Sequence, residues 1–308
     1  MQLGITLPTY RKYAEPRLIR ETALKAEAYG YHSVWAIDHI VLPEDYAMGA
    51  VGGRGGFGSV VYEPFATLGF VAGLTARLMV GTSISPIAYR HPLLQAKMVA
   101  TLDQLSGGRA IYAGAAGYLE GEFTALGIEF HKRGAIADEY LQALRIAWTA
   151  DRPAFHGRFV DFAGVRVDPK PLQKPHPPIW VGGDSDAAYR RVVRYGDGWH
   201  GQLTSDATMA GLERRIARLH EIAREEGREP RTIRISLKQS LRITGRDDPA
   251  ETRFFIGTVE KVAADLERCA ALGVETVVSQ STVDRGSEDI ESVDVIGTKL
   301  IPRLERGR

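Results

Sequence analysis

An acid and an imidazole lie side by side at the end of an apolar segment. Asp38 and His39 directly follow residues 33–37, which read SVWAI. A continuous run of β-branched and aromatic side chains is typical of a buried parallel strand, and parallel α/β folds place their chemistry at the carboxyl ends of such strands. A histidine exchanges protons near neutral pH, and an adjacent carboxylate can orient its ring. The pair is therefore a candidate for proton transfer; the alternative is that Asp38 caps a turn and His39 is an ordinary loop residue.

Two further predicted strand ends carry small residues. Residues 80–86 read VGTSISP, and residues 113–117 read AGAAG. Residues with little or no side chain let a flat ring system approach the backbone closely. The two segments therefore predict a wall for a planar ligand, against the alternative that the small residues only ease strand–helix packing.

A third segment suits a phosphate group. The apolar residues 179–181 run into Gly182, Gly183, Asp184 and Ser185, where a helix is predicted to begin. Exposed backbone N–H groups at a helix N-terminus bind anions, and barrels often place phosphate sites on late strands. The alternative is a tight turn capped by Ser185 and Asp184. Asp184 opposes an anion here unless its side chain turns away.

The glycine-rich residues 49–58 resemble a phosphate-binding loop only superficially. They contain six glycines in ten positions but lack the Gly-Lys-Ser/Thr ending of a P-loop and the strand-turn-helix context of a dinucleotide site. So many glycines are costly in regular structure, so we predict a mobile loop that could close over a ligand. Residues 115–133 and 153–177 also interrupt the strand–helix alternation.

No metal site or serine nucleophile is expected. The histidines are scattered singly, the chain has one cysteine, Cys269, and no Gly-x-Ser-x-Gly elbow occurs. Cys269 is interpreted as a core thiol, and His91 as a packing or capping histidine.

These segments are positioned by an alternation of strands and helices. Strands are predicted at 2–6, 33–37, 78–83, 109–114, 178–182, 198–203, 233–239 and 276–280. Helices are predicted at 16–29, 64–74, 92–105, 136–149, 185–195, 208–226, 259–272 and 290–304. Eight such units predict an α/β fold of the (β/α)8 TIM barrel type, with a doubly wound open sheet as the alternative. We expect one domain over residues 1–308, with insertions after strands 2 and 4 and before strand 5.

The composition points to small-molecule partners. The 308 residues are 44% hydrophobic and 25% charged, with a net charge of +1, which gives no general attraction to nucleic acid or to a membrane surface. No leader-like segment or membrane-length apolar run is visible, so a cytoplasmic location is expected.

The order of several motifs resembles the luciferase-like monooxygenase superfamily over nearly the whole chain. The matching stretches are VWAIDHIVLP at 34–43, YEPF at 62–65, RHPL at 90–93, TLDQLSGGR at 101–109, PIWVGG at 178–183 and GDGW at 196–199. The resemblance implies an eightfold barrel that binds FMN or the deazaflavin coenzyme F420 at its C-terminal mouth. The Asp-His pair followed by Ile-Val-Leu-Pro is most similar to the F420-dependent branch, because bacterial luciferases tend to carry Glu-His there.

The resemblance also implies roles for individual residues. Asp38 would hydrogen-bond the cofactor ring region, and His39 would lie beside the reactive carbon as acid or base. A non-prolyl cis peptide at Ser83–Ile84 would back the ring. The implied cofactor-binding residues are Asp38, Thr82, Ser83, Ile84, Ala115, Ala116, Gly117, Val181, Gly182, Gly183, Asp184 and Ser185.

Two positions depart from the family pattern. Relatives often read Gly-x-Gly-x-Gly where this chain has AGAAG at 113–117. Sugar-phosphate dehydrogenases of the F420 branch carry a glutamate at the position that matches Tyr118, which argues against that substrate.

The expected function is hydride transfer between bound coenzyme F420 and a small organic substrate, with His39 handling the proton. One alternative is an FMN-dependent monooxygenase fed by a separate reductase. Others are a non-catalytic flavin-binding protein and, more distantly, a metal-dependent barrel hydrolase. A homodimer is expected because relatives often form dimers.

Overall fold

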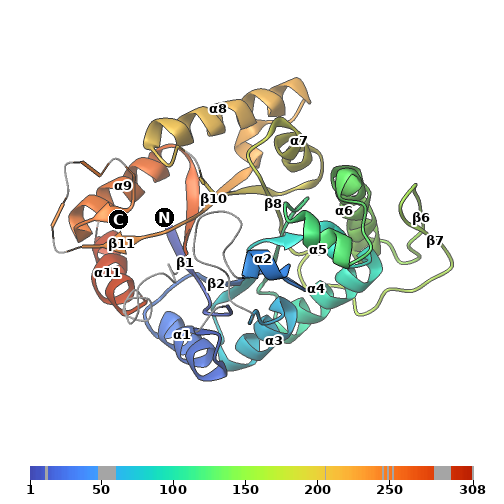
Figure 1. The fold of residues 1–308 in the computed structure, drawn as a ribbon, viewed down its shortest axis with the longest axis horizontal. Helices are drawn as coiled ribbons and strands as arrows, with labels where there is room; N and C mark the ends of the chain where they lie inside the picture. Colours follow the sequence, from blue (N-terminus) through green and yellow to red (C-terminus); the bar gives the residue numbers. More distant parts are fainter. Residues whose placement is uncertain are drawn as a thin grey trace.

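The strands close into a barrel. The computed structural model describes residues 1–10, 13–47, 60–204, 206–244, 246–247, 250–251, 253–280 and 293–306. Within these residues, parallel strands pair in the order β3-β2-β1-β13-β10-β9-β8-β5, and β3 also pairs with β5. This closure confirms the predicted (β/α)8 barrel and excludes an open doubly wound sheet (Figure 1). The barrel strands are β1 (Gln2–Thr6), β2 (Ser33–Ala36), β3 (Met79–Thr82), β5 (Ala110–Ala115), β8 (Ile179–Gly182), β9 (Gly198–Gly201), β10 (Arg234–Gln239) and β13 (Val274–Ser279).

Helices surround the strands as an outer ring (Figure 1). They are α1 (Pro16–Ala28), α3 (Pro64–Leu74), α4 (Pro92–Ser106), α6 (Arg133–Thr149), α7 (Asp186–Tyr195), α8 (Met209–Glu225), α9 (Val259–Ala271) and α11 (Ile301–Arg306). Proline occupies the first turn of α1, α3 and α4, where its fixed φ suits a helix start. No helix in the described part of the chain is long and apolar enough to cross a membrane.

Shorter elements decorate this frame. They are α2 (Glu44–Ala47), α5 (Glu120–Ala125), β4 (Ser85–Pro86), the antiparallel pair β6 (Phe155–His156) and β7 (Asp161–Phe162), the parallel pair β11 (Arg242–Ile243) and β12 (Ile256–Gly257), and the segments η2 (Ile87–Tyr89), η3 (Phe130–Lys132), η4 (Pro230–Thr232) and η5 (Ile296–Leu300). The hairpin expected in 153–177 is thus present, whereas α2, α5 and the β11–β12 pair were not predicted. The glycine-rich residues 49–58 lie outside the described residues, as do the first three residues of the helix predicted at 290–304.

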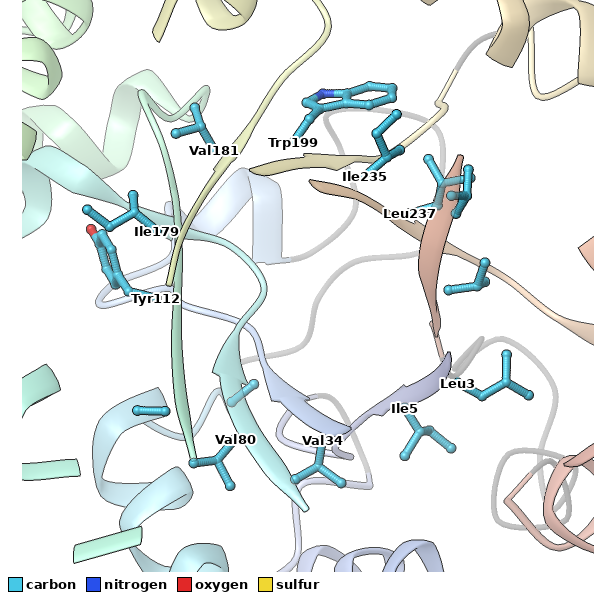
Figure 2. Close-up of a cluster of buried hydrophobic side chains, with 14 of the residues drawn as sticks. Leu3, Ile5, Val34, Val80, Tyr112, Ile179, Val181, Trp199, Ile235 and Leu237 are labelled. Carbon is cyan, nitrogen blue, oxygen red and sulfur yellow. The ribbon is translucent and has the colours of Figure 1, made fainter. Parts of the chain in front are cut away.

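The main core lies between the barrel and the helices. Figure 2 shows side chains from successive strands pointing away from the barrel axis, among them Leu3, Val34, Val80, Ile179 and Leu237. All five are at most 5% exposed. Side chains of a strand alternate between its two faces, so the neighbours of these residues point into the barrel.

The barrel interior is filled by stacked rings. Trp35 stacks on Trp180 and on His200, with centroids 5.3 and 5.0 Å apart. A Cβ atom on Gly81 would lie 2.4 Å from Cζ3 of Trp35, so only glycine allows the indole to lie this close to β3.

Substitution of Gly81 tests this close packing. We expect Gly81→Ala to lower the free energy of unfolding by about 1–3 kcal/mol in urea denaturation, because the new methyl group must displace the Trp35 indole. Gly73→Ala is the control, since an added Cβ in this part of α3 meets no heavy atom within 4 Å. Alanine is the better helix former there, so this variant should gain about 0.5–1 kcal/mol. Unchanged stability of Gly81→Ala would contradict the packing described.

Candidate active site

A cavity of about 970 Å³ opens at the carboxyl ends of the barrel strands. It is lined by most of the residues predicted from the sequence: Asp38, His39, Ser83, Ile84, Ala115, Ala116, Gly117, Gly182, Gly183, Asp184 and Ser185. Thr82 and Val181 are not in the lining. Thr82 exchanges hydrogen bonds with the backbone of Ala113, and Val181 points outward (Figure 2). A side-chain contact of these two residues with a cofactor is therefore not supported.

His39 is held by a carboxylate that the sequence did not reveal. Nδ1 of His39 lies 2.8 Å from Oε2 of Glu122, a fully buried residue of α5. The same carboxylate accepts from the Tyr89 hydroxyl at 2.7 Å and from the backbone N–H of Ile40 and Val41. Burial alone would raise the pKa of Glu122, but the hydrogen bonds from His39, Tyr89 and Ile40 hold it below its ordinary value.

An ionised Glu122 determines the tautomer of His39. The carboxylate accepts hydrogen bonds only, so Nδ1 of His39 is the donor in this pair. Proton exchange on the cavity side is then left to Nε2. The rings of Tyr46 and Tyr118 lie 6.4 and 6.3 Å from the His39 ring, and their hydroxyls are hydrogen-bonded to each other at 2.7 Å. His39 is thus an oriented acid or base beside an aromatic wall.

Asp38 has a different environment. Its side chain is fully buried, and Arg90 donates to both carboxylate oxygens, at 2.6 and 3.0 Å. Ser85 donates to Oδ2 as well, at 2.5 Å. Arg90 also pairs with Glu63 at 3.0 Å and lies over the ring of Phe65. The carboxylate therefore has three protein donors, and it ties the end of β2 to the segment between β3 and α4.

A narrow apolar wall lies beside this pair. The peptide bond between Ser83 and Ile84 is cis, as the family resemblance implied. A Cβ atom on Gly182 would lie 2.3 Å from Cδ1 of Ile84 and 3.5 Å from Cβ of Ala115. Any side chain at position 182 would thus fill the space next to Ile84, so the chain keeps this part of the cavity open for a flat group.

The predicted phosphate turn begins α7. Gly183 has φ 110°, a conformation that favours glycine, and its carbonyl accepts from Nε1 of Trp199 at 2.7 Å. Ser185 caps the helix by accepting from the N–H of Ala188. Asp184 pairs with Arg215 at 3.4 Å, which offsets the negative charge that argued against an anion.

Two guanidinium groups border the same side of the cavity. Arg133 donates to the carbonyls of Gly117 and Phe130 and lies 3.8 Å from the centre of the Phe130 ring. Arg191 is nearly buried and pairs with Asp138 at 2.6 Å. A negatively charged group at the turn would therefore be bound in a positive field.

Sequence reasoning missed several groups of the site. Glu122 is separated from His39 by 83 positions, and Arg90 from Asp38 by 52, so no local pattern links them. Lys238 was visible as a lysine within a predicted strand, which is a signal in itself. No group of three or more His, Cys, Asp or Glu side chains suited to a metal occurs among the described residues.

Removal of the Asp38 charge tests the buried ion pair. Asp38→Asn leaves the buried Arg90 guanidinium without its main partner, so we expect a loss of about 3–5 kcal/mol in the free energy of unfolding. Glu129→Gln is the control because it breaks the exposed pair of Glu129 with Lys132, which should cost less than about 1 kcal/mol. Similar urea midpoints for both variants would contradict the structural role of Asp38.

Known proteins share this fold and sequence pattern. The chain is 30% identical over 235 residues to an FMNH2-dependent dimethylsulfone monooxygenase of Pseudomonas putida, covering 75% of this chain and 62% of that protein. The chain thus spans about three fifths of that relative's length.

Two solved structures have the same fold. A coenzyme F420-dependent tetrahydromethanopterin reductase from Methanopyrus kandleri superposes with a TM-score of 0.79 at 18% identity, covering 98% of this chain and 99% of that one. An F420-dependent secondary alcohol dehydrogenase, solved with an F420-acetone adduct, gives 0.77 at 20% identity, covering 98% of each chain. The family model for luciferase-like monooxygenases matches residues 1–273, and the chain belongs to this family.

Proposed function

We propose that the protein is an oxidoreductase that transfers a hydride between coenzyme F420 and a small organic substrate. The observation that carries the proposal is the oriented His39–Glu122 pair, which borders the same cavity as the wall at Ile84 and Gly182. A proton-exchanging group beside a slot for a flat ring is the arrangement that hydride transfer requires. The sequence from Asp38 to Pro43 supports a deazaflavin through its resemblance to the F420-dependent branch.

The chain's own residues divide the work. Bound F420 would supply the carbon that gives or accepts the hydride. His39 would move the proton through Nε2, and Glu122 would keep the ring in the required tautomer. The backbone of Gly183 to Ser185 would hold the phosphate at the start of α7. Asp38, paired with Arg90, would fix the end of β2 and line the ring region. The contacts of the other predicted residues with the cofactor stay predictions.

The wider assembly also belongs to this proposal. A small-molecule substrate, the absence of nucleic-acid and membrane partners, a homodimer and a cytoplasmic location all stay predictions. A non-catalytic flavin-binding protein would show a bound chromophore but no redox change with any substrate.

The cofactor is tested by titrating the purified protein separately with F420 and with FMN. We expect F420 to bind at least about tenfold more tightly, a difference of about 1.4 kcal/mol. Fluorescence of the ligand reports binding. Tight binding of FMN alone, with oxygen uptake when the reduced flavin and substrate are present, would replace the proposal by the monooxygenase alternative, to which the Pseudomonas relative points.

The proton role is tested with His39→Ala and Glu122→Gln. We expect His39→Ala to lower kcat by about 10²–10⁴-fold with cofactor affinity unchanged, because the proton carrier is lost. Glu122→Gln should cause a smaller loss, because His39 remains but its tautomer is no longer fixed. The cofactor absorbance is followed with the substrate that a screen of alcohols, aldehydes and carboxylic acids selects.

A surface pair provides the matched control. His156 and Asp161 form the same kind of contact, Nδ1 to Oδ2 at 2.9 Å, with both side chains exposed on the β6–β7 hairpin. His156→Ala should leave kcat unchanged. Loss of cofactor binding in His39→Ala with unchanged turnover of the bound fraction would reverse the assigned role.

A further inference from the structure

Lys238 lies at the floor of the cavity, near the barrel axis. It is 5% exposed, and its Nζ atom donates to the carbonyl of Ser83 at 2.7 Å. Lys238 belongs to β10, and Ser83 directly follows β3. In the strand order, β10 is four steps from β3 in either direction, so the two strands face each other across the barrel. The hydrogen bond therefore spans the barrel, with the ammonium group in the cavity lining.

This ammonium group lacks a negative partner in the described part of the chain. Its printed hydrogen bond goes to a neutral carbonyl, and burial alone lowers its pKa to about 8. The other buried cations are paired differently, because Arg90 lies against Asp38 and Arg191 against Asp138. An isolated buried charge is costly, so one that opens on a cavity is a candidate for ligand binding.

The surroundings of Lys238 supply no negative charge. Beneath it, His200 bonds to the hydroxyls of Ser83 and Ser236. Burial and the nearby Lys238 lower the pKa of His200 to about 3, so its ring is neutral at physiological pH. At the rim, Gln202 donates to Gln280 at 3.1 Å, and both residues line the cavity. The groups that surround the ammonium are polar but uncharged.

The cavity thus has two unlike halves. The predicted cofactor residues follow β2, β3, β5 and β8, which are adjacent in the barrel. The opposite half, formed by β9, β10 and β13, contributes Gln202, Lys238 and Gln280. Its one charged group is a cation, so this half suits a ligand with negatively charged oxygen.

We propose that Lys238 binds a negatively charged oxygen at the barrel axis, and that this oxygen belongs to a carboxylate or similar oxyanion of the substrate. The second clause rests on the proposed function, because it assigns the cofactor to the other half of the cavity. The same chemistry has a second source, since a reduced deazaflavin or flavin ring can carry a negative charge beside a carbonyl oxygen. The experiment separates the two sources.

The test compares Lys238→Met with wild type. The probes are carboxylates from acetate to benzoate, each with its matched neutral amide, titrated calorimetrically into protein loaded with oxidised cofactor. We expect a carboxylate to bind wild type and to bind Lys238→Met at least about tenfold more weakly, since hydrogen bonds to charged groups have this strength. The amides should not distinguish the two proteins, and Lys238→Arg should retain part of the carboxylate binding.

Lys170→Met is the matched control. The Lys170 ammonium also donates to backbone carbonyls, those of Ala147 and Ala150, but Lys170 is not among the cavity-lining residues. This variant should bind the carboxylates as wild type does. Thermal unfolding is measured in parallel, and Lys238→Met should melt no lower than wild type, because an apolar side chain replaces a desolvated charge. A lower melting temperature with unchanged carboxylate binding would show a purely structural role and overturn the proposal.

The remaining outcomes are also decisive. Weaker binding of the reduced cofactor alone, with carboxylate binding unchanged, would place the charged oxygen on the ring and overturn the substrate assignment. Failure of every carboxylate to bind wild type would overturn the oxyanion site. The titration is repeated without cofactor, so that Lys238-dependent carboxylate binding in a protein that binds neither F420 nor FMN would support the site while the proposed function fails.

Discussion

The buried ion pair between Asp38 and Arg90 is the constraint on which the site depends. Neither charge is tolerable alone in the interior, so each holds the other in place. Because Arg90 comes from the segment just before α4, the pair fastens the end of β2 to the connection that follows β3. His39 is the next residue along the chain, and Glu122 then fixes its ring from α5. The orientation of the proposed acid or base therefore follows from two buried carboxylates with different partners.

The distribution of charge gives the cavity a direction. The carboxylates of Asp38 and Glu122 are occupied by donors from the protein itself. The cationic groups of Arg133, Arg191 and Lys238 border the same space. An anionic phosphate near α7 and a second anion at the barrel axis are the ligands that this arrangement favours. The proposed cofactor and the proposed substrate class are thus two consequences of one charge pattern.

Local pattern predicted the frame of the molecule, and contacts between distant segments determined the rest. Alternating apolar runs and helix signals located the eight barrel strands to within a few residues, because strand periodicity and proline starts are local properties. The cis bond at Ser83–Ile84 came from family resemblance, not from any local signal. Glu122 was visible only as one acid among others in an insertion, since its link to His39 arises from folding. Thr82 and Val181 show the limit of short segments, because strand position alone did not indicate which face each side chain would take.

A crystal structure of the protein with bound deazaflavin tests the central claim most directly. The account predicts that the ring lies between His39 and the wall formed by Ile84, Ala115 and Gly182, with the phosphate at the backbone of Gly183 to Ser185. Electron density for the ring against Lys238, Gln202 and Gln280, or for the phosphate away from the start of α7, would contradict it.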